Sequence, residues 1–512
     1  MSPRVNQANR FHSDPAAEAA GRMSSTSAVE LVLKRVRLRA RRRSAWMAYL
    51  QNGDGTSGEA VWGASLGASL DDRDTQEREA AWYGGTEALQ PLNGELAQVE
   101  LALAGSAGAG LHQLGSLFRL SESEMDLLQA CLALAVDPAL ATVYGYLQHS
   151  LARGYATEPF AARLFGHGRR SLWNPGGPLA LWKLVVAGEA PPGEPCPLTM
   201  DPLVTDWLHG ELRMDPALVG LLHFVEPRQP LEGWPVDAAV HSIQRVLDHG
   251  SSVRVLLTGA PWSGRRTFAA TVAARFRIQT LSIDTSEVQD SDWPDIYMRG
   301  QRMAVLGGTT LVWHGSRLDR SWSGTVAPAP IQFVACDLDQ VVTPCDHVID
   351  HPMEMPALTL DERRGLWKSA LPESAAWPAN ELENLVTRYR LNTGDILSVG
   401  RRAPASAREA ADFARELTRQ RLGELGRLLD CPFMWEDLVV PDRLREGLED
   451  FAFEARDRAA FWESPGHGAC FRGEEDSWAF SAAPREPARP WPLRSSLLTS
   501  HWIFFVSILP AW

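Results

Sequence analysis

The chain has 512 residues, of which 45% are hydrophobic and 22% charged, and its formal net charge is −13 at pH 7. This length predicts several globular domains, and the acidic balance argues against wholesale nucleic-acid binding. Six cysteines are too few for a disulfide framework in so long a chain, and Met1 to Arg22 lacks an apolar secretory segment. Both features predict a reduced, cytoplasmic setting.

Residues 1–28 are small and polar, and we expect them to be disordered. From Val29 to Met47, apolar residues recur at helical spacing within a run of arginines, namely Arg35, Arg37, Arg39, Arg41, Arg42 and Arg43. This helix is either a basic arm for nucleic acid or membrane, or a helix whose arginines pair with acidic residues. The net charge favours the second interpretation. The segment NGDGTSG at residues 52–58 is typical of a linker.

The next segment, residues 111–230, predicts compact helices with short connections. Ser121 and Glu124 form the pattern of a capping box, and Asp137-Pro138 should end the helix that it opens. A further helix is expected around Leu140–Ala152. These features predict a mainly helical, winged-helix-like module. No basic recognition helix stands out, so we interpret it as a structural adaptor rather than a DNA reader.

Strands and helices then alternate between residues 231 and 348, the pattern of a parallel sheet covered by helices. Strands are predicted at Val253–Thr258, at Thr280–Ile283, within Val305–Trp313 and at Ile331–Cys336, with a helix at Phe268–Phe276. From Pro356 to Asp430 the chain becomes helical, with candidate helices at Leu360–Leu371, Glu381–Tyr389 and Asp395–Arg401.

The first of these strands leads into LLTGAPWSGRRT, residues 256–267, which nearly matches the phosphate-binding P-loop pattern G-x-x-x-x-G-K-[ST]. Arg265 stands at the lysine position and Arg266 at the position of the hydroxyl that binds Mg²⁺. Trp262 should crowd the loop, and Thr267 comes one place too late. The candidate nucleotide-binding residues are Gly259, Ala260, Pro261, Trp262, Ser263, Gly264, Arg265, Arg266 and Thr267. The loop backbone and Arg265 could bind ATP or ADP weakly, whereas Mg²⁺ binding is doubtful.

The acidic pair that normally ends the third strand is also replaced. Trp313, His314 and Gly315 stand where Asp-Glu would hold Mg²⁺ and activate water. Asp319 is a poor substitute because it follows a break in the pattern. Asp337 and Asp339 lie near a typical sensor position but fit ordinary loop acids equally well. We therefore predict no catalytic residues, and little or no ATP hydrolysis.

With these motifs, residues 231–402 resemble the first, degenerate module of a bacterial AAA-family ATPase. LVTRYRLNTGDILSVGRRA resembles the helical lid of that family, and FRLSESEMDLLQACLALAVDP its N-terminal winged-helix region. The resemblance implies a P-loop NTPase-like α/β parallel sheet with a helical lid, preceded by a mainly helical winged-helix-like domain. WEDLVVPDRLREGLEDFAFEARDR, at Trp435–Arg458, resembles the entry of a second module that would carry the complete nucleotide site. The expected regions are 1–28, 29–110, 111–230, 231–352 (degenerate core), 353–430 (lid), 431–465 (second module) and 466–512.

Residues 466–512 have no clean periodicity and are rich in Trp, Pro, Arg and Ser. In the neighbouring reading frame, Arg472 to Arg489 can encode GGRLVGLFSGPPGTGKT, which contains a complete P-loop. We therefore expect that a frameshift near Gly466 has destroyed the second module. The alternative is a genuine divergent tail, including a C-terminal membrane anchor, although the apolar run Trp502–Trp512 is shorter than a membrane helix requires.

Two main functions remain open. The first is an AAA ATPase-like protein with a regulatory or vestigial nucleotide module, a protein partner or a homo-oligomeric ring, and no membrane association. The second is a non-enzymatic adaptor that binds DNA or protein through the winged-helix-like domain and the arginine-rich helix. A hydrolase built on His314 is a remote third option. Arg388, Arg401 and Arg402 are candidate lid contacts, and the sequence identifies no arginine finger.

Overall fold

The computed structural model describes residues 15–52, 74–105, 110–322, 329–345, 347–389 and 391–422, with parts of 441–449. The chain divides into two compact units. The first comprises Met1–Arg228, Asp237–Leu257 and Ala269–Met353, and the second comprises Gln229–Val236, Thr258–Phe268 and Glu354–Trp512. The predicted linker beyond Asn52, most of the predicted second module and the tail at 466–512 lie outside the described residues.

The first unit opens with a helical region. Its helices are α1 (Pro15–Asn52), α3 (Gln76–Gly85), η1 (Glu87–Leu89), α4 (Gln90–Gly105), α5 (Gly110–Phe118), α6 (Glu122–Val136), α7 (Leu140–Leu147), α8 (Glu158–Phe165), α9 (Pro178–Leu181), α10 (Pro202–Leu208) and η2 (Pro216–Leu218). Two short antiparallel strands, β1 (Val185–Ala187) and β2 (Leu198–Met200), form a hairpin between α9 and α10.

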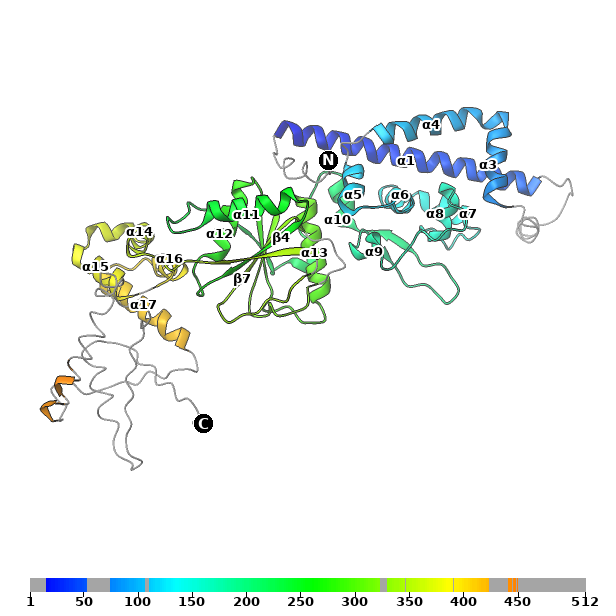
Figure 1. The fold of residues 1–512 in the computed structure, drawn as a ribbon. Coiled ribbons are helices and arrows are strands. Elements are labelled where there is room, and N and C mark those ends of the chain that lie inside the picture. Colours follow the sequence, from blue (N-terminus) through cyan, green and yellow to red (C-terminus); the bar gives the residue numbers. More distant parts are fainter. Residues whose placement is uncertain are drawn as a thin grey trace, which may run out of the picture. The chain divides into compact units, whose positions relative to one another are not determined.

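The long helix α1 belongs to the core of this region. It begins at Pro15, so the helix starts inside the segment 1–28 that we expected to be disordered. Val32 and Val36 are fully buried in one hydrophobic cluster with Leu128 of α6. Figure 1 shows α1 lying alongside α4. The regions 29–110 and 111–230, which were expected to be separate, therefore share one hydrophobic core.

Local signals fixed the ends of α6 correctly but not those of α7. Both halves of the Ser121–Glu124 capping box are formed, and α6 ends at Val136 as predicted. The next helix was expected to reach Ala152 but ends at Leu147. His149 adopts a left-handed conformation with φ of +54°, which stops a right-handed helix.

The middle of the chain forms a six-stranded sheet with the order β3-β5-β6-β7-β4-β8. The strands are β3 (Leu222–Val225), β4 (Ser252–Thr258), β5 (Thr280–Asp284), β6 (Thr310–His314), β7 (Ile331–Cys336) and β8 (Val348–Glu354). β5, β6 and β7 are parallel, and β3 pairs antiparallel with β5 at one edge. The four predicted strands are confirmed, and β3 and β8 are additional. The predicted α/β architecture with a mostly parallel sheet is therefore confirmed.

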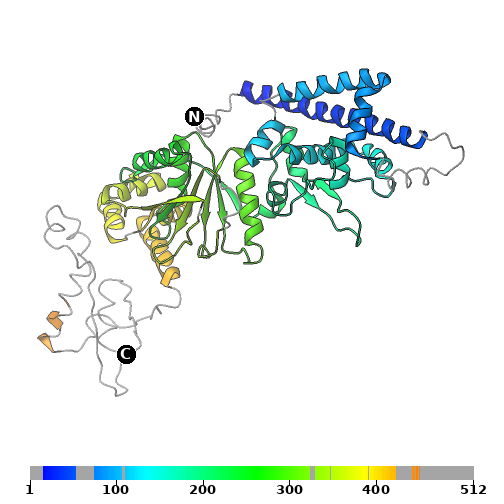
Figure 2. The ribbon, with the colours of Figure 1, turned by 45° about the vertical axis from the view of Figure 1, so that its right-hand side comes forward.

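Helices cover both faces of this sheet. They are α11 (Val236–Asp248), α12 (Arg265–Arg275) and α13 (Trp293–Gly307). The chain crosses the sheet in one direction from β4 to β5 and returns from β5 to β6. Right-handed crossovers therefore place α12 and α13 on opposite faces, as Figure 2 shows. α13 was not predicted, and only its end, at 305–307, overlaps the segment that was expected to contain the third strand.

Buried ion pairs join α13 to the helical region of the same unit. Arg302 is fully buried and contacts Asp201 at 2.8 Å and Asp215 at 2.9 Å. Arg299 contacts the same buried Asp215 at 3.0 Å. Buried charges are tolerated when they are paired and hydrogen-bonded, so this network holds the helical region and the sheet together as one unit.

The second unit contains the helical lid. Its helices are α14 (Leu360–Ala370), η3 (Pro372–Ala376), α15 (Ala379–Arg388), α16 (Thr393–Arg401) and α17 (Ala407–Leu422). Trp367, Val386 and Ile396 are fully buried in its core. Capping boxes open α14 at Thr359 and α16 at Asn392. The helical character predicted for this segment is confirmed.

Candidate nucleotide-binding loop

The predicted loop lies between a strand and a helix. β4 ends at Thr258, and α12 begins at Arg265. The amide of Phe268 donates to the carbonyl oxygen of Gly264 at 2.8 Å, which closes the first helical turn. Amides at the start of a helix lack partners within it and favour anions. The strand–loop–helix arrangement of a phosphate-binding loop is therefore present.

Two loop residues adopt left-handed backbone conformations. Gly264 has φ of +91°, and a Cβ added there would lie 3.0 Å from the Trp234 ring, so glycine is required. Trp262 has φ of +64°, a conformation that costs a non-glycine residue roughly 1–2 kcal/mol. The Trp262 residue is 60% exposed. The bulk that was expected to crowd the loop therefore lies largely in solvent.

The lid contacts this loop through the start of α16. Asn392 Nδ2 donates to the Pro261 carbonyl oxygen at 2.8 Å, and the Gly394 amide donates to the Trp262 carbonyl oxygen at 2.8 Å. We call these two hydrogen bonds the loop–lid clasp. A Cβ added to Gly394 would lie 3.1 Å from Trp262 Cβ, so glycine permits the close approach. The clasp was not predicted, although the segment LNTGDI, which contains Asn392 and Gly394, lies within the predicted lid.

The charged side chains at the start of α12 cannot supply the usual metal ligand. Arg265, Arg266 and Thr267 are the first three residues of the helix. Arginine offers only hydrogen-bond donors and stays protonated, so Arg266 cannot ligate Mg²⁺. Successive helical residues point about 100° apart, so the Thr267 hydroxyl does not replace the one missing at position 266.

The end of β6 carries no acidic side chain. Trp313 is fully buried and packs against Trp293, Tyr297 and Trp322, with ring centroids 5.4 to 5.8 Å apart. Its Nε1 donates to Gln332 Oε1 at 3.2 Å. The position is therefore an aromatic core position rather than a ligand position.

The next two residues point to the end of β5. His314 lies opposite Asp284 in the parallel register, and His314 Nδ1 is 3.8 Å from Asp284 Oδ2. Gly315 has φ of +125°, and a Cβ added there would lie 2.7 Å from Ser286 Oγ and 2.8 Å from Asp284 Oδ1. A side chain at Gly315 would be strained by this φ and would have to displace the side chains of Ser286 and Asp284. Asp284 was not predicted, although an acid at the end of a buried strand is a signal for such a position.

The other predicted acids do not gather into a metal site. Asp319 and Asp339 are exposed loop residues. The Asp337 amide donates to Gln340 Oε1 at 2.9 Å, and Gln340 Nε2 donates to the Gly315 carbonyl oxygen at 3.0 Å. Within the described ranges, no group of three His, Cys, Asp or Glu residues could hold a metal ion.

The candidate arginines of the lid have different environments. Arg388 lies in α15, and its side chain is outside the described residues. Arg401 is exposed at the end of α16. Arg402 pairs with Glu416 at 2.5 Å and lies over the Phe413 ring. Arg402 therefore makes contacts within the lid itself.

The arginines of α1 pair mainly with acids of the same helical region. The pairs are Arg35 with Asp126 at 2.6 Å, Arg37 with Asp137 at 2.7 Å, Arg39 with Glu100, and Arg43 with Asp74 at 2.8 Å and Glu79 at 2.7 Å. This is the pairing interpretation favoured by the net charge. It leaves few of these guanidinium groups for phosphates of DNA.

Two family models match separate parts of the chain. Residues 29–222 match the winged helix domain, variant, and residues 359–430 match the contractile injection system ATPase helical domain. The match at 29–222 supports the predicted winged-helix region and includes the part of α1 from residue 29 onward. The match at 359–430 supports an ATPase-like relationship for the predicted lid.

The chain was also compared with curated proteins and with solved structures. No curated protein matches the chain. Among solved structures, PCH-2 of C. elegans is 12% identical, and the match covers 40% of this chain and 75% of that one. The TM-score is 0.29, too low to support an argument. Among the described residues, no helix has the length and apolar character needed to cross a bilayer.

Proposed function

We propose that this chain is an ATPase-like protein, related to ATPases of contractile injection systems, whose loop at 259–267 is a catalytically silent nucleotide module. The residue types at the two usual metal-binding positions support this proposal. Arg266 stands where a metal-binding hydroxyl is needed, and the buried Trp313 stands where a metal-binding carboxylate is needed. The module would then have a regulatory or vestigial role.

The loop fits the phosphates of ATP or ADP but not Mg²⁺. Backbone amides at the start of α12 and the Arg265 guanidinium are suitable donors for phosphate oxygens. Ser263 Oγ and Thr393 Oγ1 are buried without a hydrogen-bond partner, and a phosphate oxygen or water would satisfy them. Mg²⁺ requires oxygen ligands, and the residues at the two usual positions provide none.

The same residues explain why hydrolysis should be slow. A water that attacks the γ-phosphate needs a positioned proton acceptor. Trp313 cannot accept a proton, and Gly315 has no side chain that could do so. The His314 imidazole beside Asp284 could accept a proton, but the loop would hold no Mg²⁺ to neutralise the phosphate oxygens during attack. We infer that bound nucleotide would stay intact.

Nucleotide turnover tests this proposal directly. We expect purified full-length protein to bind ATP weakly and to release no phosphate above background with Mg²⁺. Arg265→Ala should weaken binding, since it removes the one charge directed at the phosphates by the loop pattern. Turnover at the rate of ordinary AAA ATPases that Arg265→Ala abolishes would contradict the silent module.

We also propose that remodelling activity belongs to intact relatives that have a second module. In those relatives a ring of identical subunits acting on a protein partner is expected. The segment of this chain that resembles the entry of such a module lies mostly outside the described residues. Sedimentation of the full-length chain with and without ATP tests whether this chain also self-associates, and a monomer under both conditions would contradict a ring of this chain.

A further inference from the structure

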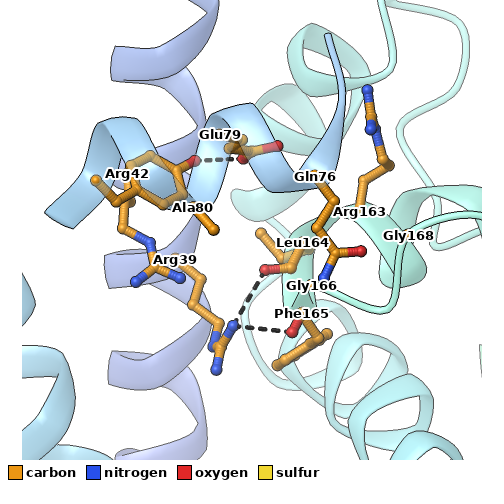
Figure 3. A pocket seen from close by; sticks show the side chains of 11 residues that line it. Arg39, Arg42, Gln76, Glu79, Ala80, Arg163, Leu164, Phe165, Gly166 and Gly168 are labelled. Atoms are coloured by element: carbon orange, nitrogen blue, oxygen red, sulfur yellow. Dashed lines mark hydrogen bonds between the residues drawn. The ribbon is translucent and has the colours of Figure 1, made fainter. Parts of the chain in front are cut away.

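A small pocket lies in the helical region of the first unit, far along the sequence from the loop at 259–267. α1, α3 and the end of α8 surround it, and its volume is about 80 Å³. Its polar lining includes Arg39, Arg42, Gln76 and Arg163, which Figure 3 labels, and also Tyr83. Three arginines therefore line one pocket, and their charges need carboxylate partners or an anion.

Most charges around the pocket are already paired. Arg39 contacts Glu100 and donates to the carbonyl oxygen of Phe165 at 3.2 Å. Arg163 pairs with Asp74 at 2.5 Å. The one lining carboxylate, Glu79, accepts from Arg43 Nη1 at 2.7 Å and from the Tyr83 hydroxyl. Glu79 is thus neutralised and does not exclude an anion.

Arg42 is different. Its guanidinium lies over the Tyr83 ring, 4.4 Å from the centroid, and no described carboxylate pairs with it. Stacking holds the planar group in place but satisfies none of its donors. The Gln76 amide likewise has no hydrogen bond among the described residues, and Figure 3 places it across the pocket from Arg42.

The amide of Gln76 is held against the turn that follows α8. A Cβ added to Gly168 would lie 2.5 Å from Gln76 Oε1, and one added to Gly166 would lie 3.4 Å from Gln76 Nε2. Both glycines have positive φ, of +69° and +86° respectively. Any side chain at Gly168 would displace the amide. Two unused donors are therefore fixed around one cavity.

We propose that this pocket binds a small oxyanion, a phosphate or carboxylate group, with Arg42 and Gln76 as donors. Arg39 and Arg163 also line the pocket, but their charges are already balanced by Glu100 and Asp74. A guanidinium matches two oxygens of such a group in a bidentate arrangement. The volume suits a single group of this size rather than a whole nucleotide.

Calorimetric titration of the full-length protein with inorganic phosphate at low ionic strength tests the proposal. Arg42→Gln should weaken binding about tenfold or more, as expected for the loss of a charge-assisted hydrogen bond. Gln76→Ala, on a different helix, should also weaken it. Arg37→Gln is the matched control, because Arg37 lies on the same helix and pairs with Asp137 away from the pocket.

A further variant separates this site from the loop at 259–267. Arg265→Ala should leave pocket binding unchanged, whatever becomes of the silent nucleotide module. Phosphate affinity that neither Arg42→Gln nor Gln76→Ala reduces, or that Arg265→Ala abolishes, overturns the proposal. Titration with acetate identifies the source of the group. Equal acetate binding supports a carboxylate of a protein or metabolite, and phosphate binding alone supports a phosphate ligand.

Discussion

Replacing Asn392 with alanine should loosen the loop–lid clasp without unfolding the lid. The substitution removes the hydrogen bond from Asn392 Nδ2 to the Pro261 carbonyl oxygen and the side-chain cap of α16. A hydrogen bond of this kind contributes about 0.5–1.5 kcal/mol, and an Asn cap about 0.5–2 kcal/mol. The lid core around Trp367 and Val386 is untouched. We therefore expect a local destabilisation of about 1–3 kcal/mol.

Hydrogen exchange measures this effect where it occurs. The Gly394 amide donates to the Trp262 carbonyl oxygen, so its protection reports the second bond of the clasp. A loss of about 1–3 kcal/mol predicts exchange roughly 5- to 150-fold faster there. Asn392→Ser separates the two contributions, because serine still caps a helix but its hydroxyl is too short to reach Pro261.

A second cap in the lid provides the matched control. Thr359→Ala removes the cap of α14 but makes no change at the clasp. It should speed exchange in α14 and leave the Gly394 amide as protected as before. If Asn392→Ala and Thr359→Ala change Gly394 protection equally, or neither changes it, the clasp does not hold the loop and the reasoning is wrong.

Three further results are expected. Arg254→Met should lower the free energy of unfolding by about 3 kcal/mol, because it leaves the Asp350 carboxylate unpaired. Arg213 is exposed, so the control Arg213→Met should lower it by less than about 1 kcal/mol. Equal shifts in the denaturant midpoint of the two variants would contradict this prediction. Burial raises the pKa of Asp74, but hydrogen bonds from Arg43 and Trp46 outweigh it and leave that pKa below its ordinary value. The ionised Asp74 therefore stabilises the fold above about pH 4, and this stabilisation is lost as the pH falls further. The free energy of unfolding should consequently decrease less on acidification in Asp74→Asn than in the original protein. Identical curves of unfolding free energy against pH for the two proteins would refute the assignment. Finally, one inserted or deleted base near codon 466 should restore GPPGTGKT in the coding DNA, and the frameshift hypothesis fails if none does.

The sequence alone was sufficient for features that depend on neighbouring residues. An apolar run, two glycines and a following helical pattern specify a strand, a turn and a helix without distant contacts. The sequence therefore predicted the succession of β4 and α12, although α12 begins at Arg265 rather than at Phe268. The capping box at Ser121 is equally local, since its hydrogen bonds span three residues. The arginine at position 266 and the tryptophan at position 313, on which the proposal of a silent module rests, could also be read directly from the sequence.

Tertiary structure decided what these local pieces contact. The clasp joins residues 131 positions apart, and no periodicity signals such a pair. The edge strands β3 and β8 acquire their structure by pairing with the sheet, which explains why their short segments were missed. The arginines of α1 had two interpretations in sequence, because a charge pattern does not reveal its partners. Only the packing of α1 against α3, α4 and α6 brought carboxylates to most of them and left Arg42 facing a pocket.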